Sequence, residues 1–287
     1  MELLITNYSF ILITFSVILR LFNKFKKLSI ISYACALGVA LGQNYIEPIG
    51  FAYILTAVAA IILFYKKNNH LYIKVAAFFF IAIFGYNLLA HQLPGFNNIQ
   101  LLYEKLSPDS EYYSLWLNYD STFFASFIFI KAYKPIGLKK HFKVIFQGVA
   151  YGAVISLILS FICLHYGIIR LDTTVPDIIW LWLWIVSLYA IFSESFYRMF
   201  FIDFIREICP GSLSWLFVTI ITSSFLFAYS HSWAGSLYVY ASFLAGVVYC
   251  VSYIKSGYRV ESSSVTHIMV NVLHFIFFTY PFYIQTS

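Results

Sequence analysis

The chain has 287 residues, of which 61% are hydrophobic and 10% charged, with a formal net charge of +6. Soluble domains carry roughly 25% charged and 45–50% apolar residues, so this composition excludes a water-soluble globular fold. The basic residues cluster beside apolar runs, so orientation in a membrane explains the positive charge and we expect no nucleic-acid partner.

Apolar runs near the length of a membrane span recur from end to end. A spanning helix needs about 20 apolar residues, and only helices and closed barrels satisfy their backbone polar groups in lipid. The runs do not alternate between apolar and polar residues, which argues against a barrel. The sequence predicts an all-α class, a polytopic transmembrane helical bundle of about ten spans (8–10). The predicted spans are 3–21, 29–46, 50–65, 72–91, 121–136, 143–165, 177–198, 211–230, 235–254 and 264–283.

The distribution of basic residues supports this layout. With the N-terminus outside, alternate loops receive every Lys and Arg except Lys105 and Arg170. The first run, 3–21, has neither a basic segment before it nor a small-residue cleavage site after it, so we expect it to be retained as a span. The sequence therefore predicts an integral, multi-pass membrane protein in contact with the lipid bilayer.

One long acidic loop, about 92–120, divides the chain unequally. We predict an N-terminal transmembrane region, 1–120, of about four spans plus this outer loop, followed by a C-terminal transmembrane region, 121–287. Asp120 at the entrance of the fifth span is interpreted as an N-cap or loop charge. Nearly all ionisable residues within spans lie in the second region, so the chemistry is expected there.

The first such group is Ser193-Glu194-Ser195-Phe196-Tyr197-Arg198, at the end of span 177–198. Glu194 and Arg198 are four residues apart and share a helix face, so they can pair. Taken alone, this motif is also typical of a structural ion pair near the membrane interface, with the Arg198 side chain reaching lipid phosphates.

Two further groups lie on later spans. Phe227 is followed four residues later by His231 at a helix end, and His267, Asn271 and His274 form an i, i+4, i+7 polar stripe. Each has an ordinary structural interpretation, as an interfacial histidine or as hydrogen bonding between helices. A stripe of this kind must nevertheless face protein or water.

The order Glu-x-x-x-Arg, Phe-x-x-x-His, His-x-x-x-Asn resembles the CPBP family (CAAX protease and bacteriocin-processing, Abi), intramembrane endopeptidases similar to CAAX prenyl protease 2. The resemblance covers roughly 177–285, the core of the second region. It implies a protease that cuts a peptide bond of a membrane-associated protein or peptide. It also suggests a bacterial cytoplasmic (inner) membrane.

The resemblance also implies roles for individual residues. His231 would assist the base that activates water, and His267 with Asn271 would form the oxyanion site, while Phe227 and His274 would support them. Glu194 matches the second Glu of the family's Glu-Glu-x-x-x-Arg motif, with Arg198 as its partner. The first Glu is Ser193 here, and a serine hydroxyl cannot accept a proton near neutral pH. Glu194 is then the candidate for the base role.

Other interpretations remain open from the residues. Two histidines and a carboxylate could hold zinc, although no HExxH helix is present and we favour a site without metal or other cofactor. A serine mechanism lacks a GxSxG element. The main alternative is a catalytically inactive relative that acts as a membrane peptide-binding, immunity or assembly protein, which Ser193 favours. A transporter is a third, without support from internal repeats.

Overall fold

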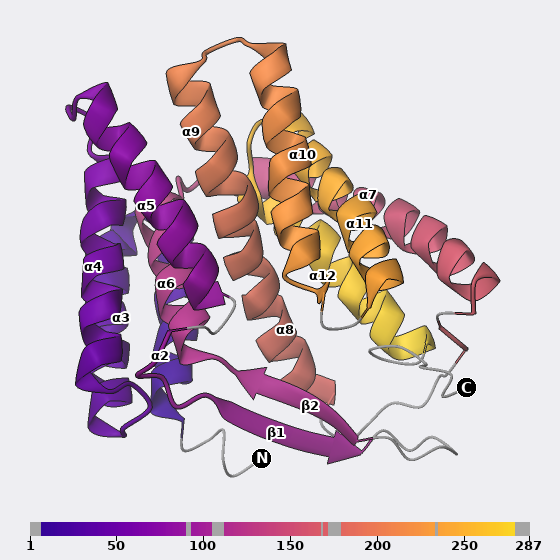
Figure 1. The fold of residues 1–287 in the computed structure, drawn as a ribbon, viewed down its shortest axis with the longest axis horizontal. Coiled ribbons are helices and arrows are strands. Elements are labelled where there is room, and N and C mark those ends of the chain that lie inside the picture. The colour runs from indigo at the N-terminus through magenta and orange to yellow at the C-terminus, as the bar shows by residue number, and fades with distance from the viewer. Residues whose placement is uncertain are drawn as a thin grey trace. The chain divides into compact units, whose positions relative to one another are not determined.

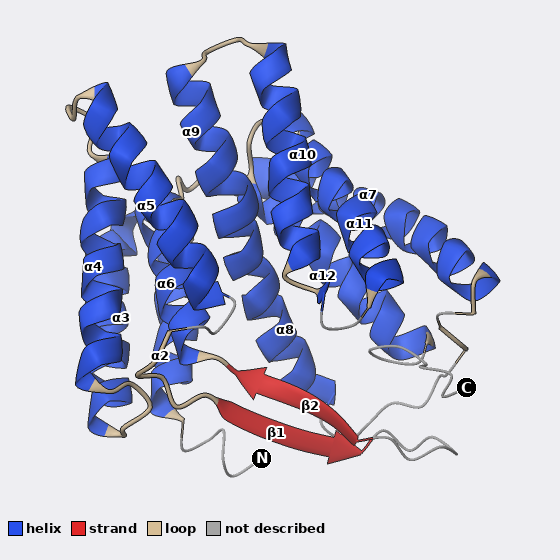
Figure 2. Cartoon of the chain, in the orientation of Figure 1, coloured by secondary structure: helices blue, strands red, loops and turns tan. Residues whose placement is uncertain are grey.

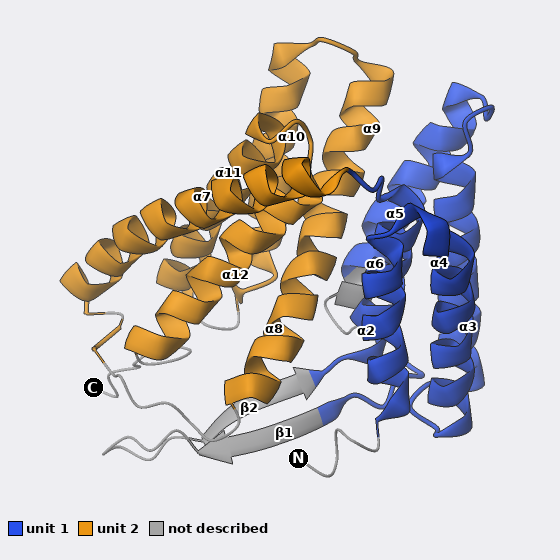
Figure 3. Cartoon of the chain, turned by 180° about the vertical axis from the view of Figure 1, so that it is seen from behind, with its two compact units in different colours: residues 1–99, 116–136 blue, residues 100–115, 137–287 orange. Residues whose placement is uncertain are grey.

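The computed structural model describes residues 7–89, 93–104, 112–167, 169–171, 179–232 and 235–278. It divides the chain into two compact units, residues 1–99 with 116–136 and residues 100–115 with 137–287 (Figure 3). Within the described residues, a helix occupies each of the ten predicted spans (Figures 1 and 2). The all-α bundle is therefore confirmed.

The first unit contains five of these helices. They are α2 (Tyr8–Arg20), α3 (Lys26–Gly42, preceded by the 3-10 turn η1, Asn23–Phe25), α4 (Pro48–Tyr65), α5 (Leu71–Leu89) and α6 (Tyr119–Ala132). The sequence predicts a boundary after residue 120, whereas α6 packs against α2, α3, α4 and α5. Every residue from Tyr119 to Ile130 is buried, so α6 is the central helix of this unit.

Two charged residues of the first unit lie deeper than the sequence suggests. Arg20 is buried at the end of α2, where its Nε donates to the carbonyl of Ile130 at 2.6 Å and its Nη2 to that of Tyr133. A guanidinium there satisfies carbonyls that the end of α6 leaves free. Asp120 is buried in the first turn of α6, and the N-cap position is Asn118.

The second unit contains the remaining helices. They are α7 (Leu138–His165), α8 (Ile179–Glu194), the π-helical segment η2 (Ser195–Phe200), α9 (Phe201–Ile208), α10 (Leu213–Tyr229), α11 (Ser236–Lys255) and α12 (Val260–Phe277). The loop predicted at 92–120 contains two strands that pair, β1 (Ile99–Glu104) and β2 (Tyr112–Leu117), which the sequence analysis did not predict.

Several predicted span boundaries are wrong by a few residues, and at the starts of α7 and α12 the reason is that charged residues continue the helix. α12 begins at Val260 rather than at 264, and Arg259 pairs with Glu261 in its first turn, with Nε 3.1 Å from Oε2. An acidic residue in a first helical turn is stabilised by the helix dipole. α7 begins at Leu138 rather than at 143, and its first turns carry the basic residues Lys139, Lys140 and Lys143.

The surface of the helices fits a lipid environment. Five helical stretches are long and apolar enough to cross a membrane, namely 23–42, 48–65, 138–165, 179–208 and 236–255, and α2, α5 and α10 contain shorter apolar helices. Large apolar side chains such as Phe146, Leu157 and Phe161 are exposed along α7. Continuous exposed apolar surface of this kind marks contact with a membrane or a partner. The chain is an integral membrane protein.

Candidate functional site

The first motif lies on one continuous helix, which runs from Ile179 to Ile208 through α8, η2 and α9. Its middle, Ser195–Phe200, is π-helical, a rare conformation that is frequent at functional sites. The Tyr197 carbonyl in this segment accepts a hydrogen bond from the Ser223 hydroxyl of α10. The wide turn is thus fixed to a neighbouring helix immediately beside Glu194 and Arg198.

Glu194 and Arg198 form an ion pair that is completely buried. Arg198 Nε lies 3.2 Å from Glu194 Oε2, and neither side chain has any exposed surface. Arg198 Nη2 also donates to the Gly246 carbonyl of α11 at 3.1 Å. A Cβ at position 246 would lie 3.1 Å from Nη2 and 3.2 Å from Ser224 Cα, so a glycine is what lets the guanidinium reach this carbonyl.

Aromatic rings surround the guanidinium. Its central carbon lies 4.6 Å from the ring centroid of Phe227, 5.3 Å from that of Tyr249 and 5.7 Å from that of Tyr197. The face of an aromatic ring attracts a cation, most strongly where water is excluded. The rings therefore offset part of the desolvation of Arg198, whose charge Glu194 balances.

His267 of α12 binds the other oxygen of the same carboxylate. Its Nδ1 lies 3.1 Å from Glu194 Oε1, so Nδ1 carries the proton and donates it to the carboxylate. The imidazole stacks on Tyr249 with centroids 4.7 Å apart and meets the ring of Phe227 edge-on at 5.4 Å. Glu194 thus fixes the orientation and tautomer of His267, which leaves Nε2 available to a ligand.

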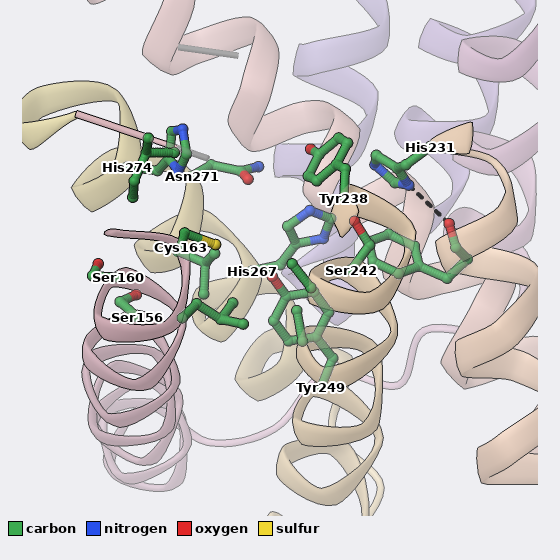
Figure 4. A pocket seen from close by; sticks show the side chains of 16 residues that line it. Ser156, Ser160, Cys163, His231, Tyr238, Ser242, Tyr249, His267, Asn271 and His274 are labelled. Carbon is green, nitrogen blue, oxygen red and sulfur yellow. Dashed lines mark hydrogen bonds between the residues drawn. The ribbon is translucent and has the colours of Figure 1, made fainter. Parts of the chain in front are cut away.

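His231 lies just after the end of α10. Its Nδ1 is 2.8 Å from the Phe227 carbonyl, which can only accept, so Nδ1 donates and Nε2 keeps its lone pair (Figure 4). The ring packs against Phe227 and, edge-on, against Tyr238. Burial lowers the pKa of His231 to about 4, because an imidazolium there would lose its hydration. His231 is therefore neutral at physiological pH.

One cavity brings the second and third motifs together. Figure 4 shows His267 between the serines of α7 on one side and Tyr249 of α11 on the other. Residues from α7, α10, α11 and α12 form its walls, together with Ile169 and His231 from the connections. The lining is Ser156, Leu159, Ser160, Cys163, Ile169, Phe227, His231, Tyr238, Ala241, Ser242, Ala245, Tyr249, His267, Val270, Asn271 and His274.

The first motif is absent from this lining. Glu194 and Arg198 lie behind His267, and half-buried Ser193 on α8 does not reach the cavity. Among the helices around the cavity, α7 supplies a wall and α8 supplies none. The helix of the seventh predicted span continues past 198 to Ile208, and Glu194, His231 and His267 belong to one connected site.

Several site residues were missed by the sequence analysis. Tyr249 and Tyr238 on α11 contact the two histidines, and Gly246 receives Arg198. They belong to a helix that carries no motif, in a chain with 24 tyrosines, so composition gave no signal for them. Ser156 and Ser160 could have been noticed, because they continue a series of small residues spaced by four on α7.

Among the residues that the structure describes, no three or more His, Cys, Asp and Glu side chains are grouped so that they could hold a metal ion. The four cysteines are unpaired with one another, Cys163 and Cys250 being buried. A site without metal stays a prediction, for which a chelator provides the test.

Comparison with known families agrees with the motifs. Residues 175–273 match the family model described as Type II CAAX prenyl endopeptidase Rce1-like. This match confirms the resemblance to CPBP proteins that the motifs predict. The matched segment includes Glu194, His231, His267 and Asn271 but ends before His274 and excludes α7. The chain has no match among curated proteins or solved structures.

Proposed function

We propose that this chain is an intramembrane endopeptidase of the CAAX prenyl endopeptidase type, which hydrolyses a peptide bond in a membrane-associated protein or peptide. One observation carries the proposal: His231, His267 and Asn271, from two separate motifs, line one cavity within a membrane-embedded helical unit. Amide hydrolysis needs an activated water, donors for the oxyanion and shielding from bulk water. The distribution of basic residues suits a bacterial cytoplasmic membrane as its location.

His231 is the group best suited to activate water. It is neutral, and the Phe227 carbonyl holds Nδ1–H, so Nε2 can accept a proton. As the water oxygen attacks the substrate carbonyl carbon, its proton moves to His231 Nε2. The same proton then passes to the leaving amine nitrogen when the C–N bond breaks, which restores neutral His231.

The opposite side of the site suits the oxyanion. The Asn271 amide can donate a hydrogen bond to it, as can His267 Nε2 when the ring carries a second proton. The Glu194 carboxylate holds Nδ1 and so fixes the orientation of the ring, and Arg198 holds the carboxylate in place. Glu194 is thus a positioning residue, which acts through His267, rather than the base that takes a proton from water.

The alternative function is that of a membrane peptide-binding protein without catalysis, acting in immunity or assembly. Ser193 favours this alternative, since the family pattern has a glutamate at that position. In the proposed mechanism His231 replaces that carboxylate. In the alternative, the same cavity binds a peptide and no group activates water.

The first test is cleavage of a farnesylated fluorogenic peptide that ends in a CAAX sequence by purified protein in lipid nanodiscs. We expect wild-type protein to release the product. Ser193→Glu tests the alternative, with Ser193→Gln as its uncharged control of similar size. Binding without cleavage by wild type, together with cleavage by Ser193→Glu only, would favour the binding protein.

Two further outcomes are decisive. Absence of both binding and cleavage in wild type and variants would contradict the endopeptidase proposal for this substrate class. We expect cleavage to survive a metal chelator; a loss that added zinc reverses would overturn the prediction of a metal-free site.

The pH dependence of cleavage tests the base directly. Because the pKa of His231 is lowered from about 6.5 to about 4, the neutral form persists as the pH falls and is lost only near pH 4. We expect kcat/KM to stay level between neutral pH and about pH 5 and to fall below it. An acidic limb centred near pH 6.5 in protein that remains folded would argue against His231 as the base.

A further inference from the structure

One face of α7 carries a small residue at every fourth position. The first two, Gly148 and Gly152, pack against α12. A Cβ at Gly148 would lie 2.6 Å from the Ser262 carbonyl oxygen, and one at Gly152 would lie 2.5 Å from Met269 Cβ. Side chains cannot approach so closely, so these glycines set the contact between the two helices, as in other small-xxx-small helix pairs.

The next two small residues, Ser156 and Ser160, line the cavity instead (Figure 4). They lie one and two turns beyond Gly152, together with Leu159 and Cys163 of the same helix. The face that packs against α12 at one end therefore becomes a cavity wall at the other. This wall lies outside the segment that matches the family model.

The Ser156 hydroxyl is buried but unsatisfied. The residue is 6% exposed, and its Oγ has no hydrogen-bond partner among the described residues. Helical hydroxyls elsewhere in the chain bond to the carbonyl four residues before, as Thr219 does to Trp215 and Ser195 to Ile191. A buried hydroxyl without a partner is unfavourable, so a partner is expected to arrive with a ligand.

The rest of the lining indicates which kind of ligand fits. It contains hydroxyl, imidazole and amide groups beside apolar side chains such as Leu159 and Val270, and it contains no Asp, Glu, Lys or Arg. A charged group would lose its hydration here without gaining an ion pair. An uncharged peptide main chain, with a carbonyl for each residue, matches these donors.

We propose that Ser156 donates a hydrogen bond to a main-chain carbonyl of the bound peptide, and that the α7 wall, Ser156, Leu159, Ser160 and Cys163, is a subsite for a neutral peptide segment. This inference rests on the proposed function in taking a peptide as the ligand. Ser156 is a positioning residue: it holds the segment next to His267 and Asn271 and takes no part in proton transfer.

Binding of a blocked peptide tests the subsite without cleavage of a CAAX substrate. The probe is an N-acetylated, C-amidated hexapeptide of Ala, Val and Thr, and affinity is measured by thermophoresis of the full chain in detergent micelles, with empty micelles as baseline. We expect Ser156→Ala to weaken binding about 3- to 10-fold, the effect of losing one hydrogen bond. Ser156→Thr keeps the hydroxyl and should retain most of the wild-type affinity for the peptide. A peptide with one residue replaced by Glu should bind wild-type protein more weakly than the neutral peptide.

Stability separates this role from a structural one. Ser156→Ala removes an unsatisfied hydroxyl, so its melting temperature should be unchanged or higher. The matched control is Ser252→Ala, since Ser252 Oγ lies 2.9 Å from the hydroxyls of both Ser262 and Thr266 outside the cavity. This control should lose stability and keep its affinity for the probe.

Two results would overturn the subsite. One is equal affinity of wild type and Ser156→Ala, which would fit a lipid chain in the cavity better than a peptide. The other is failure of the wild type to bind the neutral probe. Failure of the endopeptidase proposal has a different signature, in which the blocked peptide binds in a Ser156-dependent manner but the farnesylated peptide is not cleaved.

Discussion

Glu194→Gln is expected to lower the free energy of unfolding by about 3–5 kcal/mol, because it leaves the Arg198 charge buried without its counterion. The amide is nearly the same size as the carboxylate, so lost packing contributes little. Rings of Phe227, Tyr249 and Tyr197 offset only part of the uncompensated charge. Unfolding in mixed micelles with increasing SDS, followed by tryptophan fluorescence, measures the change.

The control is the double variant Glu194→Gln, Arg198→Met, which removes both charges and keeps the volume filled. Replacing a whole buried ion pair by uncharged groups is often neutral, so this variant should recover most of the stability. Glu194→Gln alone could instead lower the free energy of unfolding by no more than about 1 kcal/mol. That result would contradict a buried ion pair, because a loss of this size is typical of a solvent-exposed pair.

His231→Ala is expected to lower kcat for peptide cleavage by about 10²- to 10⁴-fold, the usual contribution of general base catalysis. The fold should remain, because the described contacts of the imidazole are the Phe227 carbonyl, the Ser230 hydroxyl and ring packing. Cleavage rate and melting temperature are measured on the same preparation.

His165→Ala is the matched control, since His165 ends α7 on an exposed surface outside the cavity. It should cleave at the wild-type rate. A His231→Ala enzyme that keeps more than about a tenth of wild-type kcat would exclude His231 as the base, whatever the effect on KM.

The helices could be predicted from the sequence because length and apolarity alone decide whether a segment crosses lipid. The same rule misplaced two helix starts, since Lys139 and Glu261 extend helices beyond their apolar runs. It also overlooked β1 and β2, although Tyr112, Tyr113 and Trp116 in the second of these strands are residues with high β propensity. These strands are too short to form an apolar run of membrane-spanning length, so they lie in a segment predicted as a loop.

The chemistry of the site was predictable in part. His231, His267 and Asn271 stood out because polar groups within apolar helices need a reason to be there. The position of Glu194 outside the cavity lining could not be predicted from the spacing of the motif. Residues four apart can pair on a helix, but the spacing does not say whether the pair faces the cavity or lies behind His267. The α7 wall was missed because hydropathy does not reveal which face of a span meets its neighbours.

The π-helical turn between α8 and α9 makes the number of residues there matter, in addition to the identity of Arg198. Each residue in an α-helix rotates the next by about 100°. Losing one residue from 195–200 would turn α9 by about that angle relative to Glu194, while Tyr197 would lose its fixed bond to Ser223. Relatives of the chain should therefore keep a constant length across 195–200, together with the buried arginine of the first motif, Arg198.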